Sequence, residues 1–252
     1  MATFGSSRCE AVVAAARATL GDAEACESMG FPRRPIGVIM YVPQHFSAPD
    51  LPSVHELLDR SGASDLITWT PRGIMATLLP FVFDPAAGEQ GALLGHLARN
   101  NEQWRHGSDA EALVIVRGPD AYVTPSWYAA KREHGRVVPT WNYVTAHVYG
   151  RLVTHDDPDW TESLVRRLTG KHESARPEPW SVDDAPEAFI KGQLRAIVGV
   201  EVVITRIEAK WKLSQNRGSA DIDGVATGLL AGTGQDHLVA EAMREAERRT
   251  AG

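Results

Sequence analysis

Three short stretches of the sequence combine cationic, aromatic and amide side chains in spacings that suit an anionic, planar ligand. They span residues 95–104, 125–131 and 210–217. The first carries His96 and Arg99 where a strand is expected to end, and the second places Lys131 beside a Trp–Tyr pair. Arginine and helix N-terminal amides bind phosphate or carboxylate groups, and aromatic rings stack on planar groups. We therefore consider convergence of the three stretches on one such ligand.

Each stretch also has an ordinary structural explanation. The residues around His96 and Arg99 suit a solvated helix start equally well on composition alone. Trp127 and Tyr128 suit a plug at the end of a barrel, which their chemistry favours. The stretch 210–217 suits a basic surface turn. The sequence by itself leaves these alternatives open.

Other chemistries find little support in the spacing of residues. The nine histidines do not occur as His-x-His, or as a pair one helical turn apart with an acid between them, so a zinc site is not predicted. Ser126 lies outside a Gly-x-Ser-x-Gly elbow and is read as a turn serine. Gly88, Gly91 and Gly95 have the wrong spacing for a dinucleotide loop. No catalytic residue is assigned.

A long strand over 139–150 has two distinct faces when it is read with a period of two. One face is predicted to carry Trp141, Tyr143, Thr145, His147 and Tyr149. The other is predicted to carry Asn142, Val144, Ala146 and Val148. The small aliphatic face indicates core, and the aromatic face is expected to lie against a second subunit or a planar ligand.

Short strands and turns dominate the rest of the pattern. Further strands are predicted over 65–69, 73–82, 92–96, 111–116, 121–124 and 199–209, with a turn at Gly118. Helices are predicted to begin near residues 50, 97, 157, 186 and 235. Because strands and helices do not alternate regularly, we expect a mainly β, α+β protein built on an antiparallel barrel or sandwich.

Composition is that of a soluble globular chain, with 43% hydrophobic and 23% charged residues. The net charge of −6 argues mildly against a broad nucleic-acid footprint. Apolar runs stay short of the roughly 18–20 residues that cross a bilayer, and the N-terminus does not resemble a secretory signal. Two cysteines, Cys9 and Cys26, do not make a disulfide framework. We expect a cytoplasmic protein without membrane contact.

The chain is predicted to have three parts. Residues 1–39 form an N-terminal extension, read as a misassigned start or as an arm that caps a dimer partner. Residues 40–230 form the main domain, because the strong patterning begins at Met40. Residues 231–252 form a charged C-terminal helix.

Six motifs together resemble the PaiB-like family, whose members are described as FMN-binding negative transcriptional regulators. The motifs are Met40–Phe46, Leu79–Phe81, Gly95–Trp104, Ala121–Tyr128, Val138–Tyr143 and Lys212–Asn216. They occur in order between about Met40 and Leu230. Asn100-Asn101-Glu102 departs from the Ala-Asn-Pro that the family usually has there.

The resemblance implies an FMN-binding split β-barrel that forms a homodimer, with the flavin in a groove between subunits. By analogy, His96 and Arg99 lie in the part that holds the phosphate, and a late segment closes over the cofactor. As a hypothesis, Arg99 and Lys212 neutralise the phosphate while Trp127 and Trp141 border the ring. The candidate cofactor-binding residues are His96, Arg99, Trp127, Lys131, Trp141, Asn142, Lys212, Ser214 and Gln215.

Two alternatives accompany the regulator assignment. One is a haem protein similar to the piperazate synthases, in which His96 is the candidate axial ligand. The other is a flavin- or haem-dependent oxidoreductase with no DNA role. DNA binding has weak sequence support, because a helix–turn–helix pattern is not evident and the arginines of the closing helix are offset by glutamates.

Overall fold

The computed structural model describes residues 40–106 and 111–251. The predictions made for residues 1–39 lie outside the described residues. Within the described ranges, none of the helices has the length and apolar character needed to cross a membrane.

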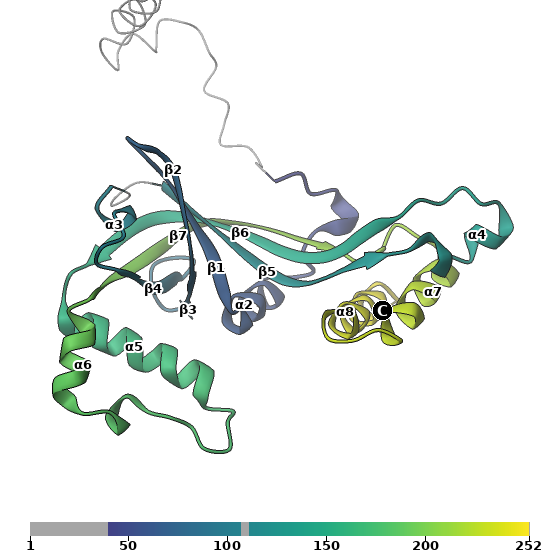
Figure 1. The fold of residues 1–252 in the computed structure, drawn as a ribbon. Helices are drawn as coiled ribbons and strands as arrows, with labels where there is room; N and C mark the ends of the chain where they lie inside the picture. The colour runs from purple at the N-terminus through teal and green to yellow at the C-terminus, as the bar shows by residue number, and fades with distance from the viewer. Residues whose placement is uncertain (1–39, 107–110, 252) are drawn as a thin grey trace, which may run out of the picture. The chain divides into compact units, whose positions relative to one another are not determined.

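A seven-stranded antiparallel sheet forms the centre of the fold (Figure 1). Its strands are β1 (Ala63–Thr70), β2 (Gly73–Pro80), β3 (Val82–Asp84), β4 (Ala92–Ala98), β5 (Glu111–Val123), β6 (Thr140–His155) and β7 (Ile197–Lys212). Their order is β2-β1-β5-β6-β7-β4-β3. The antiparallel, mainly β architecture with peripheral helices is therefore confirmed.

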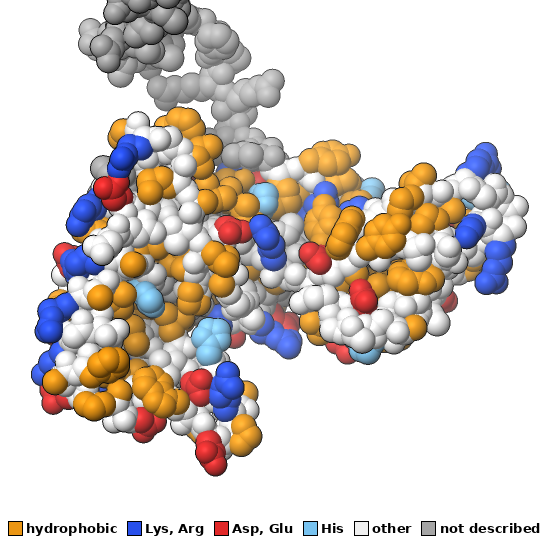
Figure 2. All heavy atoms as spheres, viewed as in Figure 1, with side chains coloured by type: hydrophobic (Ala, Val, Ile, Leu, Met, Phe, Trp, Pro, Cys, Tyr) orange, Lys and Arg blue, Asp and Glu red, His pale blue; other side chains and the backbone are white. Residues whose placement is uncertain are grey.

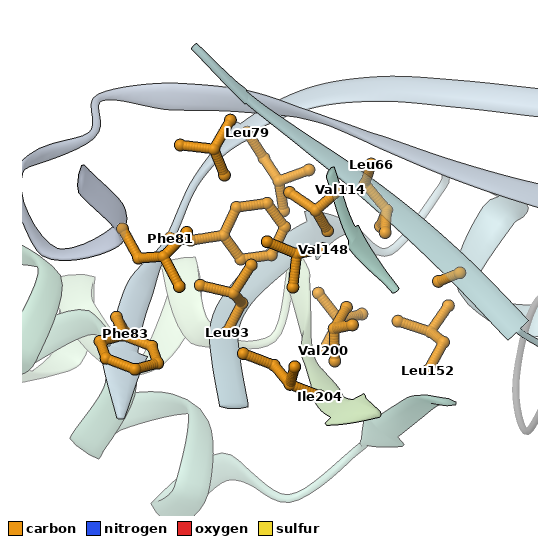
Figure 3. Close-up of a cluster of buried hydrophobic side chains, with 14 of the residues drawn as sticks. Leu66, Leu79, Phe81, Phe83, Leu93, Val114, Val148, Leu152, Val200 and Ile204 are labelled. Carbon is orange, nitrogen blue, oxygen red and sulfur yellow. The ribbon is translucent and has the colours of Figure 1, made fainter. Parts of the chain in front are cut away.

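The two ends of the strand order are joined by the chain itself. β2 and β3 are outermost in the sheet, yet only Phe81 separates them. The sheet must therefore curl until its ends approach each other, and a Cβ added to Gly95 on β4 would lie 2.9 Å from the Leu79 side chain of β2. Leu66, Leu79, Phe81 and other apolar side chains fill the interior (Figure 3). This closure is the split barrel that the family resemblance implied, and it decides between the barrel and the sandwich that the strand pattern left open.

Seven α-helices and three 3-10 turns surround the sheet in the described ranges. The helices longer than one turn are α2 (Leu51–Arg60), α5 (Pro158–Glu173), α6 (Glu187–Leu194), α7 (Ser219–Leu230) and α8 (Gln235–Ala251). The short elements are α3 (Gln103–His106), α4 (Ala130–Glu133) and the 3-10 turns Gln44–Phe46, Pro125–Trp127 and Val182–Asp184. Asp50 caps α2 by accepting a 2.7 Å hydrogen bond from the Ser53 amide, so the predicted helix start is confirmed.

The long strands β5, β6 and β7 extend beyond the barrel, and helices α7 and α8 cover that extension (Figure 1). A second hydrophobic cluster fills the space between them and includes Val144, Leu213 and Met243. Asn142, Val144, Ala146 and Val148 are buried, whereas Tyr143, Thr145 and His147 are half-exposed. The predicted two-faced strand is therefore confirmed over 142–148, whereas Tyr149, expected on the outer aromatic face, is buried under the Arg206 guanidinium.

Several element predictions are wrong in detail. The strand expected over 73–82 is interrupted at Phe81, because there the chain passes from one end of the sheet to the other. The helix expected from residue 97 begins only at Gln103, since Leu97 and Ala98 still pair with β7. The turn expected at Gly118 is a bulge within the single strand β5.

Candidate functional site

The predicted site residues fall in two separate places on the chain. His96 lies on β4 opposite Gly199, near the start of β7, whereas Lys212 is the last residue of β7. At the usual rise per residue the two positions are about 40 Å apart along the strand. A single chain therefore does not bring the two groups of residues together.

His96 borders a cavity of about 270 Å³ between the barrel and α5. Burial lowers the pKa of His96, which favours its neutral imidazole. Neither ring nitrogen has a hydrogen-bond partner within residues 40–106 and 111–251. The lining also includes His172, Glu173 and Trp180. A neutral imidazole has one unprotonated ring nitrogen, which can accept a hydrogen bond or bind a metal centre.

Arg99 is engaged by its own chain. Its guanidinium binds both carboxylate oxygens of Asp156 at 2.7 and 3.0 Å, which raises its pKa. It also donates to the carbonyls of Arg195 and Ile197 at 2.7 and 3.0 Å. These bonds link the residue after β4 to the residue after β6 and to the residues around the start of β7. In this arrangement the Arg99 guanidinium bonds groups of its own chain and stabilises the contact between these segments, so these donors are not directed at a phosphate.

A cluster of cations and aromatic rings lies at the other end of β7, and we call it the Lys212 site. It comprises Lys210, Lys212, Arg217, Tyr143 and Phe46. The ammonium groups of Lys210 and Lys212 lie 5.6 and 5.9 Å from the Tyr143 ring centre and 6.0 and 5.8 Å from that of Phe46. They share one face because residues two apart on a strand point the same way.

The charges of the Lys212 site are not balanced by carboxylates. Among the described residues, Lys210, Lys212 and Arg217 form no ion pair. Burial lowers the pKa of Lys212, and the nearby charges of Lys210 and Arg217 lower it further. A bound anion would relieve this repulsion. The donor set therefore fits a phosphate group such as that of FMN.

Exposed aromatic side chains lie beside the Lys212 site. Lys212 donates hydrogen bonds to the Thr140 hydroxyl at 2.7 Å and to the Trp141 carbonyl. The Trp141 side chain is 52% exposed and meets Tyr122 edge-on at 6.2 Å. A planar ring could pack on this surface while a phosphate reaches the cations.

Trp127 and Lys131 occupy other positions. Trp127 packs against α7, where a Cβ added to Gly228 would overlap its ring and a Cβ added to Gly224 would overlap its backbone carbonyl. Trp127 therefore packs under a helix, in the second hydrophobic cluster beyond the barrel, and does not plug the end of the barrel as expected. Lys131 is exposed on α4 and donates a 3.0 Å hydrogen bond to the Ser126 hydroxyl.

Asn142, Ser214 and Gln215 shape the turn after β7. The fully buried Asn142 amide exchanges hydrogen bonds of 3.0 and 3.1 Å with the Ser214 hydroxyl, and Ser214 has a φ of 67°. The Gln215 side chain accepts from the Leu213 amide at 2.7 Å and donates to the Trp211 carbonyl at 2.6 Å. These residues position Lys212 and Arg217 through the backbone.

Sequence reasoning did not assign roles to Lys210, Arg217, Tyr143 or Phe46. The alternation of Lys210 with Lys212 signals a shared strand face, and Tyr143 belonged to the predicted aromatic face. Phe46 had no such signal, because it reaches the site through an isolated backbone bridge between Ser47 and Lys210.

Comparisons with known proteins agree with this architecture. Residues 40–206 match the family described as "Putative FMN-binding domain". Protease synthase and sporulation protein PAI 2 of Bacillus subtilis is 32% identical, over 72% of this chain and 85% of that protein. An uncharacterized protein of Emericella nidulans is 31% identical, over 77% of this chain and 96% of that protein. The chain therefore belongs to the PaiB-like family of FMN-binding domain proteins.

Proposed function

We propose that this protein binds FMN at the Lys212 site and acts as a dimeric negative regulator of transcription. The observation that carries the FMN part is the group of three cations without carboxylate partners, set against aromatic rings. Lys210, Lys212 and Arg217 would hold the phosphate, and Trp141 and Tyr143 would border the ring. FMN supplies redox chemistry when it is bound, and these residues supply position and charge.

An exposed apolar surface on β1 and β2 supports the homodimer. Trp69 and Ile74 lie directly opposite each other across the two strands and are 70% and 67% exposed. Leu78, two residues past Ala76 on the same face, is 65% exposed. Large apolar side chains gathered in this way mark interaction surfaces. A second copy would also offer a way to place the His96 cavity of one subunit near the Lys212 site of the other.

The regulatory part rests on relationship. The Bacillus subtilis relative carries a name that refers to protease synthesis and sporulation, which are cellular programmes rather than a reaction. We infer a similar regulatory role for this protein, with the flavin state as its signal. Because one fold can serve many functions, the regulatory role is tested by measuring whether the protein binds DNA.

One observation favours a second candidate, haem binding. His96 is half-buried, its pKa is lowered by burial, it has no hydrogen-bond partner among the described residues, and it faces a cavity. These are properties of an axial haem ligand.

The absorption spectrum of the purified protein separates the two candidates. We expect flavin bands, in the protein as isolated or after addition of FMN. An intense Soret band that disappears in His96→Gln would favour haem, and a protein that binds neither cofactor would refute both. Gel-shift assays of the holo-protein on its own promoter fragment test regulation, and redox turnover without DNA binding would favour an oxidoreductase.

A further inference from the structure

The cations of this protein are distributed in two ways. Away from the tip of the β5–β6 hairpin, most arginines of the described residues pair with carboxylates. Examples are Arg60–Glu56, Arg72–Glu102, Arg117–Asp65, Arg166–Glu162, Arg167–Asp84, Arg176–Glu173 and Arg249–Asp50. At the hairpin tip, residues 126–136, the side chains of Lys131, Arg132 and Arg136 are exposed and form no ion pair with a described residue.

The hairpin tip adds to the charge of the Lys212 site. Lys212 bonds Thr140, the first residue of β6, so both groups of cations lie at the same end of the protein. Together they contain six cations, and Glu133 is the carboxylate within these two stretches. This concentration occurs in a chain whose net charge is −6. Figure 2 shows Lys and Arg side chains gathered at the end where Figure 1 labels α4.

The hairpin tip is fixed to the body of the protein although its cations face solvent. Tyr128 is 2% exposed in the second hydrophobic cluster, and Trp127 packs against Gly224 and Gly228 of α7. The carboxylate of Asp221 accepts a 2.9 Å hydrogen bond from the Ala130 amide at the start of α4. An ordered loop loses little conformational entropy when its side chains bind.

We propose that the hairpin tip binds the phosphate backbone of duplex DNA through Lys131, Arg132 and Arg136. A phosphate backbone carries a continuous series of negative charges, so cations on an ordered, protruding loop can contact it without a fixed spacing between them. Of the tip's aromatic residues, Tyr128 is buried and Trp127 packs against α7, and residues 129–136 contain no Phe, Tyr or Trp. The three tip cations therefore have no freely exposed ring among them on which the bases of a single strand would stack. The contact is therefore independent of base sequence. This inference rests on the proposed regulatory function and names the surface that would perform it.

The test compares two double variants of the FMN-loaded, full-length protein. Arg132→Gln with Arg136→Gln removes two tip cations, and Arg60→Gln with Lys191→Gln removes two cations from exposed helix ion pairs. DNA affinity is measured for a promoter duplex over a range of salt concentrations. We expect the salt slope of the tip variant to fall by about one per cation removed in each subunit, and that of the control to stay unchanged. Unchanged flavin absorbance in both variants verifies their fold and cofactor site.

The outcomes distinguish the tip from the regulatory function. Equal slopes for both variants and the wild type, with DNA binding intact, would overturn the tip assignment and leave regulation standing. Failure of the wild-type holo-protein to bind any duplex would overturn both. Binding to polyglutamate in place of duplex DNA, lost in the tip variant, would overturn the DNA assignment in favour of an acidic protein partner.

Discussion

Lys212 shows how strongly neighbours decide what a cationic residue can do. Its ammonium lies among Lys210, Arg217 and aromatic rings, and its pKa is lowered by burial and by the two cations. Arg99 has the same sign of charge but is held by Asp156 and two backbone carbonyls. Both residues lie in motifs that resemble those of the PaiB-like family. Residues near Arg99 in the sequence, however, do not predict that Asp156 lies beside it. The long-range contact decides which of the two can serve a ligand.

His96 predicts a pH dependence of stability. Burial lowers its pKa below the ordinary value near 6.5, so the unfolded chain binds more protons than the folded one as pH falls below that value. We expect the free energy of unfolding, measured by urea denaturation, to decrease between pH 7.5 and 5.5. His147, whose pKa is also lowered mainly by burial, contributes in the same direction.

The His96→Gln variant isolates this contribution. It removes the titrating group and keeps a polar side chain of moderate size, so its decrease in stability over the same pH range should be smaller. His237→Gln, at an exposed position of α8, is the matched control and should follow the wild type. An identical pH dependence in all three proteins would contradict the neutral, buried imidazole.

At the scale of elements, periodicity predicted most strands and the capped helices, because these features are local. Asp50 and Asp157 are N-cap residues followed by helical patterns, and they predict the starts of α2 and α5 from the sequence. The missed helix α7 contains Gly224 and Gly228, which weaken its helix signal. Their purpose is tertiary, since both make room for Trp127. Local patterns cannot reveal a glycine that is required by a partner about a hundred residues away.

Gly228→Ala tests this packing of α7 on the hairpin. The new Cβ would overlap the Trp127 ring, so we expect destabilisation by about 1–3 kcal/mol despite the better helix propensity of alanine. Gly170→Ala in α5 is the control, because its Cβ would meet nothing within 4 Å. That variant should gain about 0.5–1 kcal/mol. Thermal and urea unfolding measure both, and equal stabilisation of the two variants would refute the tight contact.

At the scale of the whole molecule, the protein places the two groups of candidate site residues at opposite ends of β7. The His96 cavity and the Lys212 site cannot meet within one chain, although the sequence motifs suggested one site. The exposed surface of Trp69, Ile74 and Leu78 supplies a reason to expect a partner copy. Alternation of apolar and polar residues identified the buried faces of most strands. It did not single out the exposed apolar face of β1 and β2, because apolar side chains occur on both faces of these strands and the pattern does not show which face is covered.

The dimer proposal predicts the effect of a charge on this surface. Leu78→Glu should shift the protein toward monomer in sedimentation velocity experiments, because a buried, unpaired carboxylate opposes association. Phe189→Glu, at a 57% exposed position of α6, should remain dimeric and serve as the control. Retained dimer in Leu78→Glu would place the interface elsewhere.

Titration of the apoprotein with FMN and with riboflavin tests the central proposal most directly, because the two ligands differ only in the phosphate. We predict that FMN binds at least tenfold more tightly and that Lys212→Gln removes most of this preference, since a charge-assisted hydrogen bond contributes about 1.5–3 kcal/mol. Lys191→Gln, in an exposed ion pair, should leave it intact. Equal affinity of the wild type for both flavins, or an unchanged preference in Lys212→Gln, would contradict the Lys212 site.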